Sequence, residues 1–283
     1  MATFKTQGIV LKRDNFREYD RIFTVYTADC GKLRCTAASI RKIKSKQAGH
    51  MEPFSCVELM IAHGRSMILR LATGVTRDVF GNIRVNLAKI ASANHCLEVT
   101  DKAVSDEHPD RYVYELLHET LCILNDREMM DSSTAPTFAR LYAFKLLSYL
   151  GYTPELLSCL ICKRRITHEE VVFNALHGGL VERRCLNSGV ESYSLPINQE
   201  IIRILNIALV QDMRGVATIG ITEGSRQHLS LIIKSFIETH LERPMRSGVW
   251  LDDMVKSHVF LLGNDTAHPA LEMCSPVSSP TVV

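Results

Sequence analysis

The sequence predicts an α+β protein in which a five-stranded barrel of the OB type precedes an α-helical bundle. Two observations support this fold class. Apolar and polar residues alternate up to about residue 75, and from about residue 83 the apolar residues recur with the helical period. A chain of 283 residues is long enough for two domains. We expect the barrel in residues 1–80 and the helical domain in residues 81–250.

Five alternating segments predict the strands of the barrel. They lie at residues 7–12, 21–27, 32–39, 54–62 and 65–73, with turns at Gly31 and Gly64 that make two hairpins. A long connection between the third and the fourth strand is compatible with an OB barrel. An SH3-like barrel would give nearly the same pattern, so the two topologies remain alternatives at the level of the sequence.

Four amphipathic segments predict the helical bundle. They lie at about residues 113–124, 138–149, 197–208 and 229–240. Pro136 in the first turn and Gly151 after the last turn mark the ends of the second segment. Each apolar stripe needs a partner, which favours a bundle. Residues 251–283 lose the periodicity and are rich in Ser, Pro, Thr and His, so we expect a disordered tail there.

Positive charge is concentrated in the predicted barrel. The whole chain has a net charge of +2, but residues 1–80 contain 14 Lys and Arg against 7 Asp and Glu. This asymmetry indicates a module that binds a polyanion, joined to a second module of another kind. The sequence contains no run of 18 apolar residues, so it predicts no membrane span.

The segment from Ser39 to Lys46 is the strongest candidate for a phosphate-binding loop. No acidic residue lies between Arg34 and Lys46, and cations docked on phosphates release condensed counterions. The alternative is a solvated loop without a ligand. We predict phosphate contacts from Arg41, Lys42, Lys44 and Lys46, with Arg34, Arg13 and Arg65 as secondary contacts.

Two aromatic residues near this loop are candidates for base stacking. Phe16 and Tyr19 lie in a predicted connection that also contains Arg17, and bases stack on exposed aromatic rings. The other aromatic residues of the barrel, Phe23, Tyr26 and Phe54, are mostly expected in its core.

A cysteine-containing insertion, residues 153–195, is a candidate metal site. Nine cysteines with irregular spacing and no signal peptide indicate a reducing cytoplasm, where paired cysteines are metal or redox candidates. Cys159-x-x-Cys162 and Cys185 supply three thiolates, and Glu182 is the fourth candidate ligand for a structural zinc ion. His177 or His168 could replace Glu182. The alternative is an insertion that has lost its metal and packs its cysteines as small apolar residues.

Motifs for catalysis are missing from the sequence. It contains no phosphate-binding glycine loop, no dinucleotide fingerprint and no nucleophile elbow. His118-Glu119 resembles the start of a zinc-protease motif, but Cys122 occupies the position of the second histidine. We therefore expect a protein that is not an enzyme.

Four stretches, in order along the chain, resemble segments of one protein family. They are residues 8–11 with residues 17–21, Gly31-Lys32 with the segment from Ser39 to Lys46 and Glu52-Pro-Phe54, residues 144–162 and residues 242–247. The third stretch, Phe144-x-x-Leu-x-x-Leu-Gly-Tyr-x-Pro-Glu-Leu156 leading into Cys159-x-x-Cys162, is the most specific. On these segments the chain resembles the bacterial recombination mediator family RecO over about residues 5–250.

This resemblance implies an N-terminal OB fold, a helical C-terminal domain and a zinc-knuckle insertion. It also implies a cytoplasmic, nucleoid-associated protein of the RecF pathway that binds single- and double-stranded DNA and anneals complementary strands. With RecR, such a protein loads RecA onto strands coated by single-stranded-DNA-binding protein. The chain departs from the family pattern at Glu182, where a fourth cysteine would stand. The alternative function is a protein–protein adaptor whose helical domain binds partner peptides, with DNA contact incidental.

Overall fold

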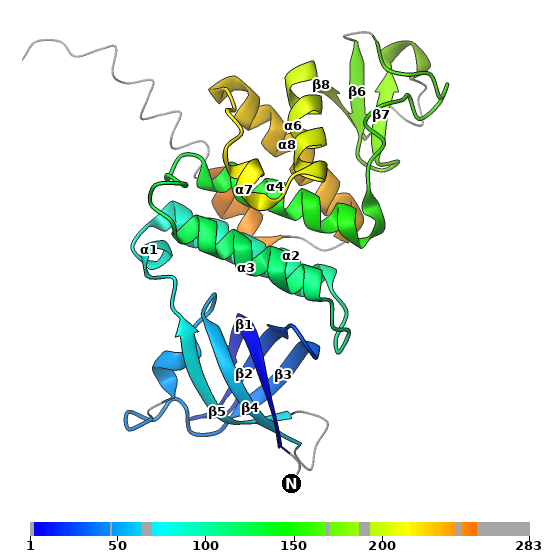
Figure 1. Cartoon of the computed structure of the whole chain (residues 1–283). Coiled ribbons are helices and arrows are strands. Elements are labelled where there is room, and N and C mark those ends of the chain that lie inside the picture. The colour runs from blue at the N-terminus through cyan, green and yellow to red at the C-terminus, as the bar shows by residue number, and fades with distance from the viewer. Residues whose placement is uncertain are drawn as a thin grey trace, which may run out of the picture.

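The computed structural model describes residues 3–45, 47–63, 69–167, 170–186, 193–241 and 245–253. A barrel forms one end of the molecule, helices form its middle, and a small sheet lies at the other end (Figure 1). The α+β class predicted from the sequence is confirmed.

The barrel contains β1 (Thr3–Asn15), β2 (Arg21–Thr27), β3 (Gly31–Ala37), β4 (Cys56–Ala62) and β5 (Leu69–Asp78). The strands close in the order β1-β2-β3-β5-β4, and β3 pairs with β5 in parallel at Cys35 and Leu69. This order is that of the OB barrel and excludes the SH3-like alternative. β5 continues five residues beyond the predicted end at Thr73, because its second half pairs with β4 from Val57 to Leu59.

The middle of β1 is buried on both of its faces. Val10 points into the barrel core, whereas Ile9 and Leu11 belong to the core of the helical domain. Tyr26 on β2 is also buried against the helices, while Phe23 and Val25 fill the barrel. A single hydrophobic core therefore continues from the outer face of the barrel into the helices.

Seven labelled helices lie in the described part of the helical domain, and a further helical segment follows at residues 246–253. They are α1 (Gly81–Arg84), α2 (Leu87–Ala103), α3 (Arg111–Asn125), α4 (Ala135–Leu147), α6 (Gln199–Val210), α7 (Met213–Ala217) and α8 (Glu223–Leu241). α2 has no counterpart among the four predicted stripes, because it buries small and polar residues such as Ala88, Ser92 and Thr100 around its circumference. α2 and α3 lie between the barrel and the remaining helices (Figure 1).

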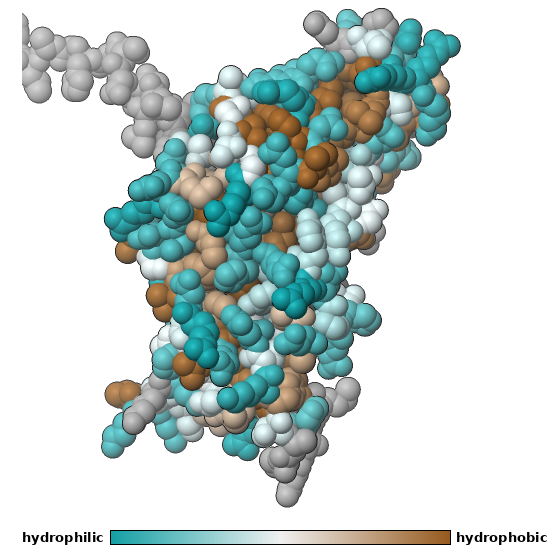
Figure 2. Space-filling model, viewed as in Figure 1, coloured by the Kyte–Doolittle hydropathy of each residue, from teal (hydrophilic) through white to brown (hydrophobic). Residues whose placement is uncertain are grey.

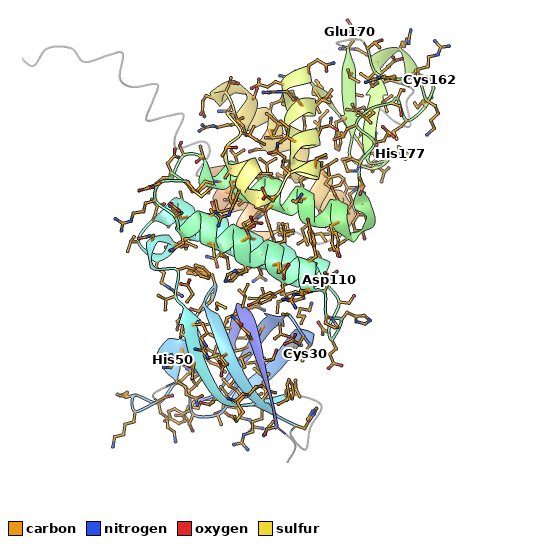
Figure 3. The ribbon with its side chains drawn as sticks, in the orientation of Figure 1. Cys30, His50, Asp110, Cys162, Glu170 and His177 are labelled. Carbon is orange, nitrogen blue, oxygen red and sulfur yellow. The ribbon has the colours of Figure 1, made fainter. Side chains whose placement is uncertain are left out.

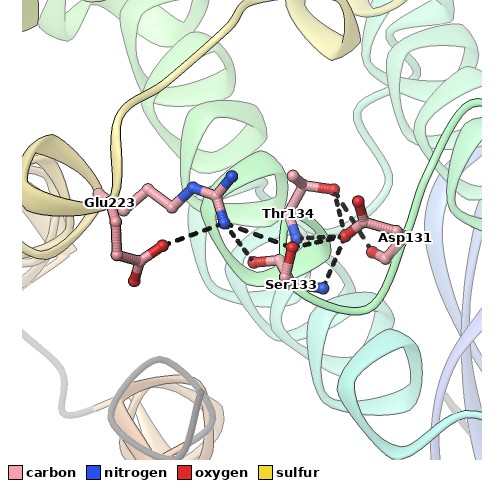
Figure 4. Close-up of polar contacts among 5 residues, drawn as sticks. Asp131, Ser133, Thr134 and Glu223 are labelled. Carbon is pink, nitrogen blue, oxygen red and sulfur yellow. Dashed lines mark hydrogen bonds and ion pairs between the residues drawn. The ribbon is translucent and has the colours of Figure 1, made fainter. Parts of the chain in front are cut away.

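α4 is the central helix, and all thirteen of its residues are buried. Asp131 accepts hydrogen bonds from the backbone amides of Ser133 and Thr134 just before α4 begins (Figure 4). A helix that is buried on all sides belongs in the interior of a bundle. Its buried cation Lys145 donates to the carbonyl oxygens of Ala208 and Gln211 at the end of α6, which satisfies both the charge and the helix end.

The helical structure extends beyond residue 250. Residues 246–253 are helical, and Leu251 is fully buried. Asp252 forms ion pairs with Arg140 of α4 and with Lys234 of α8. The first three residues of the expected tail therefore belong to the folded domain, because they complete the charge balance of a buried arginine. Residues 254–283 lie outside the described part of the chain.

Candidate nucleic-acid interface and metal site

The basic loop lies between β3 and β4 at the end of the barrel that points away from the helices (Figure 1). Ile40 is buried in the barrel core and anchors the loop. The backbone amide of Ser39 donates to Oδ1 of Asp20 at 2.8 Å. The start of the loop is therefore fixed by the barrel, while Arg41, Lys42 and Lys44 are exposed.

The basic loop contacts the connection between β1 and β2. The backbone amide of Arg41 donates to the carbonyl oxygen of Tyr19 at 3.0 Å, and its guanidinium donates to the carbonyl oxygen of Glu18 at 3.0 Å. Nζ of Lys42 lies 5.3 Å from the centre of the Tyr19 ring. The two loops thus form one surface that combines cations with an aromatic ring.

Phe16 and Tyr19 are each 45% exposed, as the sequence predicted. The guanidinium of Arg17 lies 5.2 Å from the centre of the Phe16 ring. Phe23, Tyr26 and Phe54 are buried, which confirms their assignment to the core. An exposed ring beside a cation is the arrangement on which a base of a single strand stacks.

Two further residues join this surface that the sequence did not single out. Arg70, on β5, lines an open hollow of about 710 Å³ together with Lys42 and Lys44. Only the parallel pairing of Thr36 with Arg70 brings this arginine to the basic loop. Ile43 is completely exposed between the two lysines. Ile43 could have been found from the sequence, because it is an apolar residue inside a basic run and such residues can insert between bases.

The secondary candidates differ in their surroundings. Arg34 is exposed on β3. Arg13 forms an ion pair with Glu52, so a phosphate would have to compete with that carboxylate. Lys46 and Arg65 lie outside the described residues.

A second candidate site lies in the insertion of residues 153–195, which we call the knuckle. Its sheet contains β6 (Val171–Asn174), β7 (Gly179–Glu182) and β8 (Ser194–Ile197) in the order β7-β6-β8. The sulfur atoms of Cys159, Cys162 and Cys185 and a carboxylate oxygen of Glu182 all lie within 4.8 Å of one another. The structure therefore brings the four predicted ligands together.

The sequence matches two models of one protein family. The description "Recombination protein O N terminal" matches residues 1–76, and "Recombination protein O C terminal" matches residues 84–248. The chain belongs to the RecO family. A DNA repair protein RecO from Desulforamulus reducens is 26% identical over 92% of this chain and 98% of its own length. One from Roseiflexus sp. is 29% identical over 89% of this chain and 86% of its own length.

The donor set of the knuckle of this RecO family member fits a metal ion. A tetrahedral zinc ion with Zn–S bonds of about 2.3 Å separates two sulfur ligands by roughly 3.8 Å, and the observed spread requires only small shifts. Burial would raise the pKa of the Cys159 thiol, but backbone amides of Cys162 and Glu182 outweigh that effect and lower it. A lowered thiol pKa favours the thiolate that binds metals.

The alternative ligands are not part of this cluster. His177 lies in the turn between β6 and β7, at the end of the sheet opposite to Cys162 (Figure 3). His168 lies outside the described residues. Glu182 is almost fully buried, and Arg184 donates to its Oε2 at 2.7 Å. Arg184 already pairs with this carboxylate, so the case for a metal ion rests on the three thiols that lie with it within 4.8 Å of one another.

The described helices of this RecO family member are all too short or too polar to span a membrane.

His118, the residue that resembles the start of a protease motif, lies against the barrel. Hydrogen bonds with Cys122 and Cys56 raise the pKa of His118 to about 10. His118 of α3 thus faces Cys56 of β4.

Proposed function

We propose that this RecO family member binds single- and double-stranded DNA through the basic loop of its OB barrel. The observation that carries the proposal is the hollow that Lys42, Lys44 and Arg70 line together, with the exposed ring of Tyr19 beside Lys42. The exposed ring of Phe16 lies beside Arg17 in the same connection as Tyr19. Cations contact the phosphates and release counterions, and the rings contact bases without reading their sequence.

The same surface supports the annealing of complementary strands. Two strands repel one another through their phosphates, and a protein that neutralises part of both charges allows them to approach. Weak base contacts leave the pairing edges free for the second strand. No step in this process requires a bond to be made or broken by the protein, so the proposed role is not enzymatic.

Membership of the RecO family supports a wider role in homologous recombination. We propose that the protein acts with RecR on strands coated by single-stranded-DNA-binding protein and helps to load RecA there. We also propose that the knuckle binds one structural zinc ion through Cys159, Cys162, Glu182 and Cys185. The metal would supply a Lewis-acid centre that fixes the fold of the knuckle.

Fluorescence anisotropy of a labelled single strand tests the DNA proposal. The double variant Lys42→Ala, Lys44→Ala should bind more weakly and should lower the salt slope by up to about 1.4, at about 0.7 for each phosphate that is no longer neutralised. The matched control is Lys5→Ala, Lys12→Ala, which removes two lysines of β1 that pair with Glu58 and Asp14. Equal slopes for the two variants would exclude the basic loop from the interface.

A protein–protein adaptor remains the second candidate, and one surface favours it. Tyr193, Leu195 and Leu231 line an open hollow of about 600 Å³ between β8 and α8. Figure 2 shows hydrophobic side chains gathered where α6 and α8 meet β8. Charge reversal in the basic loop separates the two functions, because an adaptor would keep its partner and its role in the cell.

A further inference from the structure

The knuckle carries a second group of cations, far from the basic loop. Lys163, Arg164 and Arg165 follow directly after Cys162, and Arg183 and Arg184 directly precede Cys185. All five side chains are exposed. The structure thus gathers on the metal-site end of the knuckle two basic runs that are separated by 17 residues in the sequence.

Most of these cations have no internal role that explains them. Arg184 pairs with the buried carboxylate of Glu182 at 2.7 Å. Within the described part of the chain, the side chains of Lys163, Arg164, Arg165 and Arg183 form no ion pair and no hydrogen bond. Unpaired surface arginines beside one another repel, so a ligand with several negative charges would stabilise the group.

The backbone that presents these cations is fixed. The amide of Lys163 donates to the carbonyl oxygen of Cys159 at 2.9 Å, and the amide of Cys159 donates to the carbonyl oxygen of Arg164 at 2.9 Å. Lys163 has a φ of +59°, a left-handed conformation that completes the turn. Arg165 forms a β-bridge with Ser158. The arginines therefore project from an ordered turn, which lowers the entropy lost when they bind.

The two basic surfaces lie at opposite ends of the molecule. In Figure 1 the basic loop is at the lower end of the barrel, and the knuckle is at the upper right, with the helices between them.

We propose that the knuckle turn, residues 163–165 with Arg183, is a second binding site for a nucleic-acid backbone. The inference rests on the proposed function of the basic loop and extends it from one strand to two. Arginine fits phosphate because its planar donors make paired hydrogen bonds. An acidic peptide would in addition require an apolar or aromatic pocket at the centre of the contact. The turn offers mainly cations.

Two strands bound at opposite ends would give the fold a second function. The protein then holds two segments at the same time, and one chain links two molecules of DNA. A simpler role for the cations is to offset the negative charge of three thiolates and a carboxylate around a divalent metal. The two roles differ in what happens to the metal when the arginines are removed.

The test is the number of short strands that one full-length chain binds. The probe is a labelled single strand of about 12 nucleotides, which matches the site size of one OB fold. The unaltered chain should bind two such strands at low salt, and Arg164→Ala, Arg165→Ala should bind one. Lys163 is left in place, because its backbone holds the turn that presents the two arginines.

Three controls make the outcome decisive. Arg164→Lys, Arg165→Lys should restore the second strand, and Arg203→Ala, Arg214→Ala removes the same charge from α6 and α7 and should change nothing. The metal content of each sample is measured in parallel. Loss of metal in the alanine variant, or an unchanged number of bound strands, would overturn the inference and leave the basic loop intact. No strand bound by the unaltered chain would overturn both proposals.

Discussion

Nζ of Lys32 on β3 lies 3.0 Å from Oδ1 of Asp106, which follows α2. The same ammonium donates to the carbonyl oxygens of Asp101 and Val104 at 2.7 and 2.9 Å. One side chain of the barrel thus satisfies the C-terminal end of α2. The joint between the barrel and the helices is polar at this point and apolar around it.

Replacing Lys32 by methionine should destabilise the protein by about 2 kcal/mol, because the variant cannot donate the charged hydrogen bonds and leaves two carbonyl groups without their donor. Urea unfolding of the variant measures the change. The control is Lys5→Met, which removes an exposed lysine and should change the free energy of unfolding by less than about 1 kcal/mol. A similar loss of stability in both variants would show that Lys32 does not stabilise the contact between the barrel and the helices.

Replacing Tyr19 by alanine should weaken binding of a single strand by about 1–3 kcal/mol without a change in the salt slope, because the ring stacks on a base and contacts no phosphate. Anisotropy titrations at two salt concentrations separate the two effects. Tyr152→Ala is the matched control, because it removes another exposed tyrosine, 42% accessible, in the helical domain. The idea fails if Tyr19→Ala binds like the control.

The stability of the protein should fall in acid through Glu98. Burial would raise its pKa, but hydrogen bonds from Lys102, Ser247 and Arg246 outweigh burial and lower it from 4.5 to about 2. A carboxyl group whose pKa is lowered in the folded state stabilises that state at pH values above its pKa in the unfolded chain. This contribution is lost as the pH falls from about 4.5 to about 2.

Glu98→Gln removes this contribution and isolates it. The variant should be less stable by about 2 kcal/mol at neutral pH, a value below full linkage because water reaches part of the carboxylate. Near pH 2 the two proteins should differ little. Urea unfolding at a series of pH values gives the comparison, and a constant difference across the series would contradict the assignment.

Metal analysis should find about one zinc ion per chain in protein purified without chelator, and much less in Cys162→Ser. Glu182→Cys should bind zinc more tightly, because a fourth thiolate replaces a carboxylate that Arg184 partly neutralises. Competition with a chromogenic chelator ranks the three proteins. If Cys162→Ser kept its zinc, the cluster would have to be reassigned.

The barrel followed from the sequence because strand periodicity is a local property. The residues from Arg21 to Thr27 form β2 with the predicted ends, and Phe23 and Val25 point into the core as alternation requires. The choice between an OB and an SH3-like barrel was not local. It depends on the parallel pairing of Cys35 with Leu69, and the pattern of each strand is the same in either case.

The site was predictable in its composition and less so in its geometry. The four candidate ligands of the knuckle are close in sequence to the turns that present them, so their spacing predicted that they would come together. Arg70 joins the basic loop only through the closure of the barrel. The pairing of Arg13 with Glu52 could not be predicted either, because it depends on where the connection before β4 passes β1. α2 was missed because its buried face is made of small and polar residues.

One hydrophobic core runs from Ile9 of the barrel through α4 to Phe173 of the knuckle sheet. Parts that share a core cannot be exposed separately without uncovering it. We therefore expect the described part of the chain to unfold in one cooperative transition, with the same midpoint for a probe in the barrel and for a probe in the knuckle. Damage to the knuckle would then lower the thermal stability of the basic loop, the surface proposed to bind DNA, at the far end of the molecule.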